Sequence, residues 1–195
     1  ATIRGRRFLN LHEYQSAQLM AEKGVNVPMG IAAKSVAEAV AAAAKIGDDE
    51  VVIKSQILAG GRGLGTFKNG FQGGVHVIKT SQVEEYAGKM LGQTLVTKQS
   101  GPEGKPVDTL LLAKKMQLVN EMYFAIMLDR ATLGPMIIAC SEGGTSIEDL
   151  AASSPEKIIK VPISIAEGIT DAQAATVVDG LKVSGDKAAA AEQIK

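Results

Sequence analysis

A lysine, an arginine and several glycines stand close together in residues 51–74, VVIKSQILAGGRGLGTFKNGFQGG. Lys54 directly follows a short run of β-branched residues, which predicts a buried strand that ends in a fixed ammonium group. Arg62 then lies within a glycine-rich loop, and glycines let backbone N–H groups approach an anion closely. The glycines around it are Gly60, Gly61, Gly63 and Gly65. Lys54, Arg62 and these N–H groups together have the chemistry of a polyphosphate-binding site.

Several interpretations of this stretch compete. A P-loop requires G-x-x-x-x-G-K-[ST], and no Lys-Ser or Lys-Thr pair follows the glycines at that spacing. A dinucleotide-binding turn requires the glycines to open a helix, whereas residues 66–74 have no helical period and residues 75–78 predict a strand. The pattern therefore predicts a strand, a flexible glycine loop and a second strand, a hairpin that could close over a nucleotide. A mobile surface hairpin without a ligand is the alternative.

The composition of the whole chain narrows the function classes. The 195 residues carry 21 basic and 21 acidic side chains, a balance that does not indicate a nucleic-acid or membrane-surface footprint. Aromatic residues make up 4% and tryptophan is absent, which argues against base-stacking platforms. The single cysteine, Cys140, excludes an internal disulfide and fits a reducing compartment. No apolar run reaches the length of a membrane span.

The order of the elements that position these residues predicts an α+β fold. Ser35 and Glu38 form a capping box ahead of an alanine-rich helix, and Thr170 with Gln173 caps the last predicted helix. Helices are predicted over residues 11–23, 35–46, 81–91, 147–152 and 170–181, and strands over residues 51–53, 75–78, 95–97, 109–116, 122–128, 135–140 and 158–163. Helices between strands early and antiparallel hairpins over residues 109–140 predict two α+β lobes rather than one doubly wound sheet.

The first and the last residues of the chain each carry a distinct pattern. Residues 1–7 are basic and free of acids, which fits the stub of a cleaved organellar transit peptide and equally an ordinary basic terminus. The last residues after Gly185 read as the opening turns of a helix with no stop signal. We therefore expect that the chain is cut rather than finished.

Three motifs resemble the β subunit of succinate–CoA ligases, particularly mitochondrial and plant-like forms. They are residues 10–15 (NLHEYQ), residues 54–63, and residues 141–144 (SEGG) ahead of Ile147 and Glu148, and the likeness extends over nearly all of residues 9–181. The resemblance implies an ATP-grasp fold, in which two lobes clasp a nucleotide in the cleft between them. Residues 1–28 and 117–195 would form one lobe, and residues 29–116 the inserted lobe with the glycine loop.

The resemblance also assigns roles to particular residues. Lys54 would contact the nucleotide phosphates, and Gly61, Arg62 and Gly63 would form the loop that covers them. Glu121 would accept hydrogen bonds from the ribose hydroxyls, a task that suits a carboxylate at a loop-to-strand junction. A solvated loop acid is the alternative for Glu121.

No catalytic side chain and no metal ligand is assigned within this chain. The phosphorylated histidine of the family lies on the α subunit, so His12 and His76 are expected to be structural. Family members are about twice as long as this chain. The part beyond residue 195 would hold the Mg²⁺ ligands and a domain that meets the α subunit.

One position departs from the family pattern. The strand that crosses the purine site usually carries a glutamate near Ala113 or Lys114, and Lys114 and Lys115 stand there instead. This substitution leaves nucleotide affinity and the purine contacts open. Because neighbours on a strand point to opposite faces, we expect one of the two lysines to face the cleft or the partner lobe.

The resemblance implies the nucleotide-binding part of a ligase in the mitochondrial matrix. With its α subunit, such an enzyme couples succinyl-CoA cleavage to ATP or GTP synthesis in the tricarboxylic acid cycle, and this chain alone is expected to be inactive. Pro28 favours ATP, because ATP-using members carry proline there and GTP-using members glutamine. The alternative is a truncated, catalytically inactive ligase-derived chain, a structural or interaction subunit of a larger assembly with other mitochondrial proteins. Neither hypothesis involves nucleic acid or a membrane span.

Overall fold

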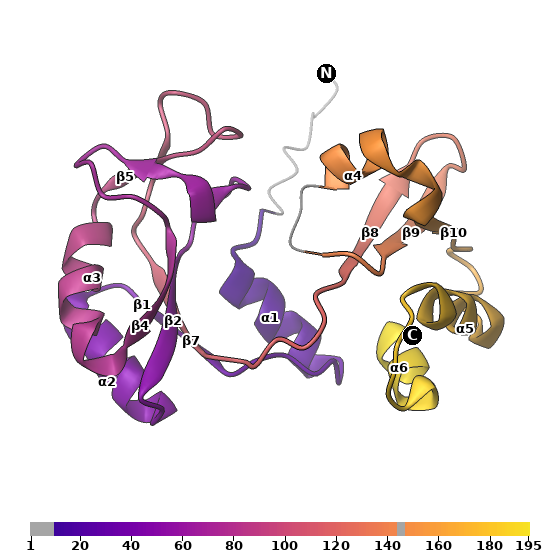
Figure 1. Ribbon diagram of the computed structural model, residues 1–195, viewed down its shortest axis with the longest axis horizontal. Coiled ribbons are helices and arrows are strands. Elements are labelled where there is room, and N and C mark those ends of the chain that lie inside the picture. Colours follow the sequence, from indigo (N-terminus) through magenta and orange to yellow (C-terminus); the bar gives the residue numbers. More distant parts are fainter. Residues whose placement is uncertain (1–9, 144–146) are drawn as a thin grey trace, which may run out of the picture. The chain divides into compact units, whose positions relative to one another are not determined.

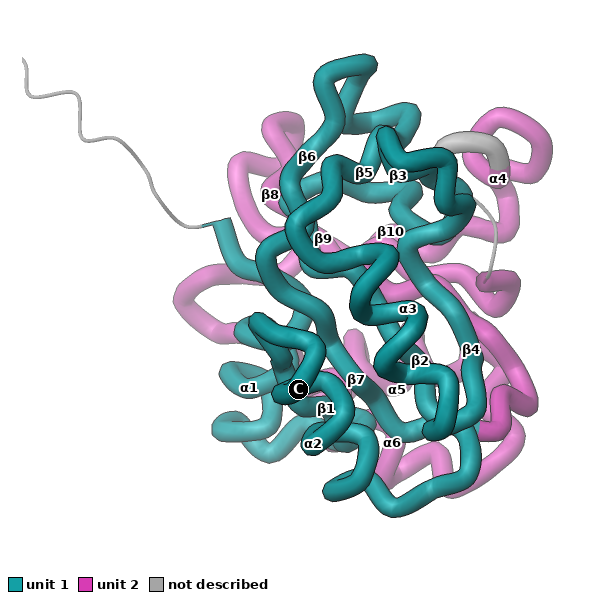
Figure 2. The backbone as a smooth tube through the Cα atoms, turned by 90° about the vertical axis from the view of Figure 1, so that its left-hand side faces the viewer, with its two compact units in different colours: residues 1–116 teal, residues 117–195 magenta. Residues whose placement is uncertain are grey.

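The computed structural model describes residues 10–143 and 147–195. It divides the chain into two compact units, Ala1–Met116 and Gln117–Lys195 (Figures 1 and 2). The resemblance places residues 1–28 in the same lobe as residues 117–195, whereas the structure groups them with the first unit. A division into compact units does not test the assignment of residues 1–28 to a lobe, and that assignment stays a prediction. The basic residues 1–7 and Gly144 of the SEGG motif lie outside the described residues.

The first unit is built on a four-stranded antiparallel sheet in the order β1-β7-β2-β4. Its strands are β1 (Gly30–Ala33), β2 (Glu50–Ser55), β4 (Val75–Lys79) and β7 (Leu110–Lys114). Strands β2 and β4 flank the glycine loop and pair with each other. The hairpin predicted around this loop is therefore confirmed.

Two helices, α2 (Val36–Ile46) and α3 (Val83–Met90), cover one face of this sheet (Figure 1). Burial alternates along β2, and Val51 and Ile53 of β2 point into the core on the helix-covered face. The Ser35 hydroxyl caps α2 by accepting a hydrogen bond from the Glu38 N–H at 3.1 Å, as the sequence predicts.

The opposite face of the sheet lies toward α1 (Glu13–Glu22). Leu111 and Ala113 of β7 point to this face and are each 5% exposed, while Leu110 and Leu112 are buried in the core on the other side. A strand buried on both faces reads as a continuous apolar run, which is the pattern of residues 110–113 (LLLA). Lys54 of β2 shares the α1 side with Leu111, its directly paired neighbour.

A second, three-stranded sheet fastens the glycine-rich hairpin of the first unit. It consists of β3 (Thr66–Phe67), β5 (Thr94–Val96) and β6 (Lys105–Pro106) in the order β3-β5-β6. Phe67 is 1% exposed and belongs to the core of this unit. The loop is therefore held beyond Gly65 rather than flexible throughout, and the sequence did not predict β3 or β6 because strands of two residues have no detectable period.

The second unit contains a three-stranded antiparallel sheet in the order β10-β9-β8. Its strands are β8 (Tyr123–Asp129), β9 (Gly134–Cys140) and β10 (Ile159–Pro162), and α5 (Asp171–Gly180) packs Val177 against buried Ile137 and Val161. The sequence predicts that residues 109–140 form one set of antiparallel hairpins. This prediction is wrong for the first strand, β7, which belongs to the sheet of the first unit. β7 pairs with β1 and β2 because its sequence suits a central strand that is buried on both faces.

Short helices complete the second unit: α4 (Ile147–Ser153), η3 (Pro155–Lys157) and α6 (Lys187–Ile194). The Asp186 carboxylate caps α6 by accepting from the N–H groups of Ala188 and Ala189 at 2.9 and 3.1 Å. Lys195 Nζ pairs with the Asp171 carboxylate at 2.8 Å, and this bond raises the pKa of Lys195 above its ordinary value. These contacts hold the last turn of α6 against α5.

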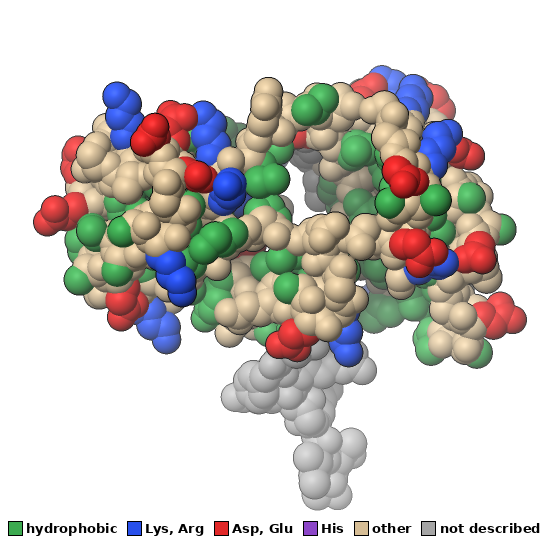
Figure 3. Space-filling view, turned by 90° about the horizontal axis from the view of Figure 1, so that it is seen from below, with side chains coloured by type: hydrophobic (Ala, Val, Ile, Leu, Met, Phe, Trp, Pro, Cys, Tyr) green, Lys and Arg blue, Asp and Glu red, His purple; other side chains and the backbone are tan. Residues whose placement is uncertain are grey.

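The described surface carries charges of both signs. Acidic and basic side chains are interspersed on the face shown in Figure 3. Over the part of the chain that the structure describes, no helix is long and apolar enough to cross a membrane.

Candidate functional site

Lys54 stands near the end of β2 and projects from the sheet face that lies toward α1. Its side chain is 26% exposed, and its Nζ donates a hydrogen bond to Glu13 Oε1 at 2.9 Å. The β-branched residues before it fix the strand, so its Cα cannot shift without disturbing the core. Lys54 is therefore a cation on a rigid element with its ammonium group accessible to solvent.

Arg62 begins the short 3₁₀ turn η1 (Arg62–Leu64) inside the glycine loop. Gly61, directly before it, has a φ of 73°, a left-handed conformation that favours glycine. The guanidinium donates from Nη1 to the Ser55 carbonyl at 3.0 Å and from Nη2 to the Glu13 carboxylate. A Cβ added at Gly63 would meet no described atom within 4 Å, so the backbone of the turn is open to a ligand.

Glu13 links the two cations that the sequence assigns to phosphate binding. Its Oε1 accepts from Lys54, and its Oε2 accepts from Arg62 and, at 3.3 Å, from the Gln56 amide. Gln56 is 2% exposed, and its Oε1 also accepts from the Tyr14 N–H at 3.2 Å, which ties the start of α1 to β2. Residues from α1, β2 and the glycine loop thus form one cluster, which we call the Glu13 cluster: Glu13, Lys54, Gln56 and Arg62.

The charges in the Glu13 cluster control the ionisation of its carboxylate. Partial burial raises the pKa of Glu13, but the hydrogen bonds and charges of Lys54 and Arg62 together outweigh burial, so the pKa lies below its ordinary value of 4.5. At neutral pH the cluster therefore holds one carboxylate and two cations, and its net charge is positive. A positive, partly buried group of this kind can bind an anion.

The pH dependence of stability follows from the lowered pKa of Glu13. A carboxyl group whose pKa is lower in the folded state stabilises the fold above its ordinary value of 4.5, and this contribution is lost as the pH falls through the lowered folded-state pKa. We expect Glu13→Gln to reduce the free energy of unfolding by about 1 kcal/mol near pH 7, because the pairs are partly exposed to solvent. The difference from wild type should shrink as the pH falls below 4.5, the ordinary pKa of the group.

Urea denaturation at several pH values measures this difference. Glu85→Gln is a matched control, because Glu85 pairs with Lys89 at 2.5 Å on the exposed surface of α3. The control should change stability by less than about 0.5 kcal/mol at any of these pH values. A wild-type minus Glu13→Gln difference that does not depend on pH would contradict the assignment.

A cavity of about 290 Å³ adjoins the Glu13 cluster within the first unit. Its volume lies just below the range for small-molecule sites, about 300–1,000 Å³. Glu13 and Lys54 line one part of it, and the remaining lining is largely apolar: Tyr14, Ala17, Gln18, Ala21, Val27, Pro28, Met29, Gly30, Leu111 and Ala113. A charged cluster beside apolar walls suits a ligand with an anionic group and a flat or apolar group.

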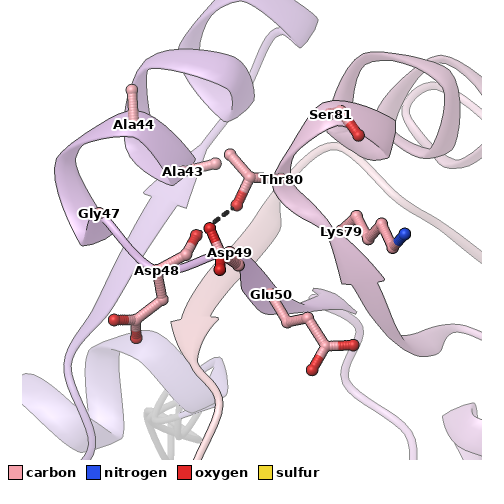
Figure 4. A pocket seen from close by; sticks show the side chains of 9 residues that line it. All are labelled: Ala43, Ala44, Gly47, Asp48, Asp49, Glu50, Lys79, Thr80 and Ser81. Carbon is pink, nitrogen blue, oxygen red and sulfur yellow. Dashed lines mark hydrogen bonds between the residues drawn. The ribbon is translucent and has the colours of Figure 1, made fainter.

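The other end of β2 borders a different hollow, of about 560 Å³ (Figure 4). The Thr80 hydroxyl donates to the Asp48 carbonyl at 2.6 Å, and the side chains of Asp48 and Glu50 point in different directions. Lys114 Nζ lies 3.6 Å from Asp48, and Lys115 Nζ lies 2.5 Å from Glu50. Both lysines are therefore engaged with acids at this end of the strand.

Lys114 stands near the position at which the resemblance leads us to expect a glutamate. Lys114 lies directly opposite Val51, a core residue, whereas Lys54 projects from the other face. Ala113 lines the 290 Å³ cavity, and Lys114 is absent from the described residues around it. The expectation that one of the two lysines faces the cleft or the partner lobe stays a prediction.

Glu121 lies in the second unit, just before β8, and is exposed. Its carbonyl accepts a hydrogen bond from the Gly143 N–H at 2.8 Å. A Cβ at Gly143 would come within 2.7 Å of the Glu121 backbone, so this position requires glycine. Residues 118–121 and 141–143 line a hollow of about 640 Å³, in which a carboxylate is accessible to a ligand.

Among residues 10–143 and 147–195, no group of three or more His, Cys, Asp and Glu side chains is arranged to hold a metal ion. His12 stacks on Tyr14 at a ring separation of 6.1 Å, and His76 contacts the rings of Phe71 and Tyr86. Both histidines therefore make packing contacts in the first unit.

A sequence profile of the ATP-grasp domain matches residues 10–195. The chain belongs to the ATP-grasp family. The α+β fold is confirmed, and the ATP-grasp fold implied by the resemblance is confirmed with it. A nucleotide cleft between the two lobes stays a prediction.

The relatives of this ATP-grasp chain include succinate–CoA ligase β subunits, so the resemblance stated above is confirmed. It is 61% identical over 193 residues to the mitochondrial ADP-forming subunit beta of Solanum lycopersicum, covering 97% of this chain and 46% of the relative. For the mitochondrial GDP-forming subunit beta of Mus musculus, the identity is 46% over 191 residues, covering 97% and 44%. The chain thus spans about half the length of these curated relatives.

Solved structures share the fold of this chain at low sequence identity. The dinucleotide-forming acetyl-coenzyme A synthetase 1 of Ca. Korarchaeum cryptofilum superimposes with a TM-score of 0.64 at 16% identity, covering 94% of this chain and 76% of that chain. ATP citrate lyase from Methanothrix soehngenii gives 0.62 at 19% identity, covering 94% and 41%. Identities this low support the shared fold alone.

Sequence reasoning missed two members of the Glu13 cluster in this ATP-grasp chain, Glu13 and Gln56. Glu13 looks like an acid in the first turn of a helix, where the helix dipole alone would explain it. Its partners Lys54 and Arg62 lie 41 and 49 residues away in sequence. The one signal was that Glu13 belongs to the NLHEYQ motif, while Lys54 and Arg62 belong to another motif of the same resemblance.

Proposed function

We propose that this chain binds ATP through Lys54, Arg62 and the backbone N–H groups at Gly61 and Gly63, with Glu121 accepting hydrogen bonds from the ribose. The observation that supports this most strongly is that Lys54 and Arg62 reach the same carboxylate from different elements. Two cations held around one anion, beside an open glycine turn, have the arrangement that a polyphosphate requires.

Pro28 and the names of the relatives support ATP as the nucleotide, and the cavity beside the Glu13 cluster offers apolar walls for its base. Pro28 and Met29 line its apolar part, and neither side chain donates a hydrogen bond to a base. The resemblance associates proline at position 28 with ATP-using members of the family. Solanum lycopersicum, Arabidopsis thaliana and Oryza sativa supply relatives that are named as ADP-forming, with identities between 59% and 61%.

We further propose that the chain is the nucleotide-binding part of a succinate–CoA ligase β subunit in the mitochondrial matrix. With an α subunit that carries the phosphohistidine, the enzyme would couple succinyl-CoA cleavage to ATP synthesis, or GTP synthesis, in the tricarboxylic acid cycle. Support comes from relatives named as mitochondrial β subunits of this ligase, of which the chain spans about half. The chain alone is proposed to be inactive, since the phosphohistidine belongs to its partner.

Phosphoryl transfer of this kind depends on positioning and charge neutralisation more than on a protein nucleophile. Lys54 and Arg62 would hold the phosphates and offset their charge, and the apolar cavity would exclude water from the base. Mg²⁺ contributes further charge neutralisation when it is bound to the nucleotide. Among the described residues, no group of three or more His, Cys, Asp and Glu side chains is arranged to hold a metal ion, and no protein ligand of Mg²⁺ is proposed among them.

Calorimetric titration of the purified chain with MgATP and with MgGTP tests the nucleotide assignment. We expect weak binding of MgATP, with a Kd of about 0.1–1 mM, because the phosphate contacts act without the rest of the enzyme. MgGTP should bind more weakly than MgATP. A chain that is folded by circular dichroism and binds neither nucleotide would contradict the proposal, and would favour a ligase-derived structural or interaction subunit.

A further inference from the structure

The Glu13 carboxylate occupies the point at which the donors of the candidate phosphate site converge. Lys54 Nζ approaches Oε1 at 2.9 Å, and Arg62 Nη2 and the Gln56 amide both donate to Oε2. We propose that Glu13 is a positioning residue that holds Lys54 and Arg62 together in the ligand-free chain and is displaced by a phosphate group when one binds. This inference rests on the proposed nucleotide-binding function of the same site.

The position of the two cations favours an anion between them. Lys54 comes from β2 and Arg62 from the glycine loop, and the two like charges repel each other unless a negative group offsets them. Arg62 is also held by its Nη1 bond to the Ser55 carbonyl at 3.0 Å. Glu13 supplies the negative group, so both cations already point at one position before a ligand arrives.

The carboxylate can be exchanged for a ligand without opening the core. The side chains of Glu13, Lys54 and Arg62 are 34%, 26% and 22% exposed, so an anion can reach them from solvent. Helix α1, which carries Glu13, has no buried residue, so the Glu13 side chain can turn away while the Tyr14 N–H bond to Gln56 keeps the start of the helix on β2. The 290 Å³ cavity is lined by both Glu13 and Lys54, and provides space beside the exchange point.

A phosphate group can replace each hydrogen bond that Glu13 accepts. An ammonium group has three N–H donors and a guanidinium five, while each carries a full positive charge. Phosphate oxygens accept such charge-assisted bonds at least as well as a carboxylate does. Exchange therefore conserves the contacts of Lys54 and Arg62 and leaves Glu13 as the group that must find a new partner.

Glu13 should then act as an internal competitor of the ligand. Glu13→Gln keeps the size of the side chain but removes its charge, so the cations are held less tightly and the site becomes more positive. We expect this variant to bind inorganic tripolyphosphate and MgATP about fivefold more tightly than wild type, as loss of a partly exposed ion pair implies. A purely structural role of Glu13 predicts the opposite, since disordered cations bind an anion less well.

The test compares wild type, Glu13→Gln and Glu85→Gln by titration with tripolyphosphate and with MgATP. Glu85→Gln removes a carboxylate from the exposed Glu85–Lys89 pair of α3, and should match wild type for both ligands. In parallel, the ¹⁵N signal of the Lys54 ammonium group is followed in wild type. Added tripolyphosphate should move this signal from its value in the Glu13 pair. Equal or weaker ligand binding by Glu13→Gln would overturn the inference.

The two probes separate this inference from the proposed function. If wild type binds MgATP and Glu13→Gln does not bind more tightly, the nucleotide function stands and the displacement of Glu13 is wrong. If tripolyphosphate moves the Lys54 signal and binds Glu13→Gln more tightly, while MgATP does not bind, displacement stands and the nucleotide assignment fails. If neither ligand moves the Lys54 signal, the displacement of Glu13 is overturned.

Discussion

Replacing Lys54 by alanine is expected to weaken MgATP binding about 10- to 100-fold, the equivalent of losing one charge-assisted hydrogen bond to a phosphate. The substitution also changes the charge of the Glu13 cluster, because Arg62 and Glu13 then offset each other and no net positive charge remains. A phosphate that approaches the variant would meet a neutral pair instead of a cationic site. The affinity for MgATP should therefore fall by more than it would after the loss of one hydrogen bond at an exposed surface.

The measurement is an NMR titration, which follows weak binding directly. Lys45→Ala is the matched control, because Lys45 is exposed in the last turn of α2 and lies outside the Glu13 cluster. The control should bind MgATP as wild type does. A change of less than twofold in Lys54→Ala would show that Lys54 does not contact the phosphates.

Replacing Gly74 by alanine should destabilise the first unit by about 2–4 kcal/mol, because the added methyl group meets atoms that cannot move away. A Cβ at Gly74 would lie 2.6 Å from Leu95 Cδ2 and 2.9 Å from the Arg62 carbonyl oxygen. Leu95 is fully buried. The Gly74 N–H donates to that same Arg62 carbonyl at 2.8 Å, and its own carbonyl accepts from the Ser55 N–H at 2.7 Å. The substitution would thus disturb the backbone that carries Arg62.

Chemical denaturation measures this effect, and amide exchange in β2 and β4 reports on the first unit separately. Gly88→Ala provides a control of opposite sign. Gly88 lies inside α3, and a Cβ there would meet no described atom within 4 Å. Alanine should stabilise this helix by up to about 1 kcal/mol. The packing argument fails if Gly74→Ala is as stable as wild type.

Local patterns predicted most of the elements around the candidate site. The β-branched run before Lys54 and the second run at residues 75–78 predicted the hairpin that β2 and β4 form. Ser35 predicted the start of α2, and Thr170 with Gln173 the start of α5, where both partners of the capping box are present. Such signals act over three or four residues, so a sequence displays them completely.

The pairing of strands was harder to predict from the sequence. Residues 109–140 look like consecutive hairpins, yet β7 belongs to the sheet of the first unit and β8 to that of the second. An alternating pattern predicts which residues of a strand share a face, but it does not identify the neighbouring strand. The choice of partner depends on which faces are left uncovered elsewhere in the unit.

The sequence by itself determined that a cationic strand end and a glycine turn lie near each other, because Lys54 and Arg62 are close along the chain and a hairpin connects them. Only the tertiary structure decided what those cations contact. Glu13 reaches Lys54 across 41 residues and Arg62 across 49, and a contact of that separation depends on how α1 packs on the sheet. No hydrophobic period or capping motif in the sequence predicts such packing, because the surfaces involved meet only after the chain has folded.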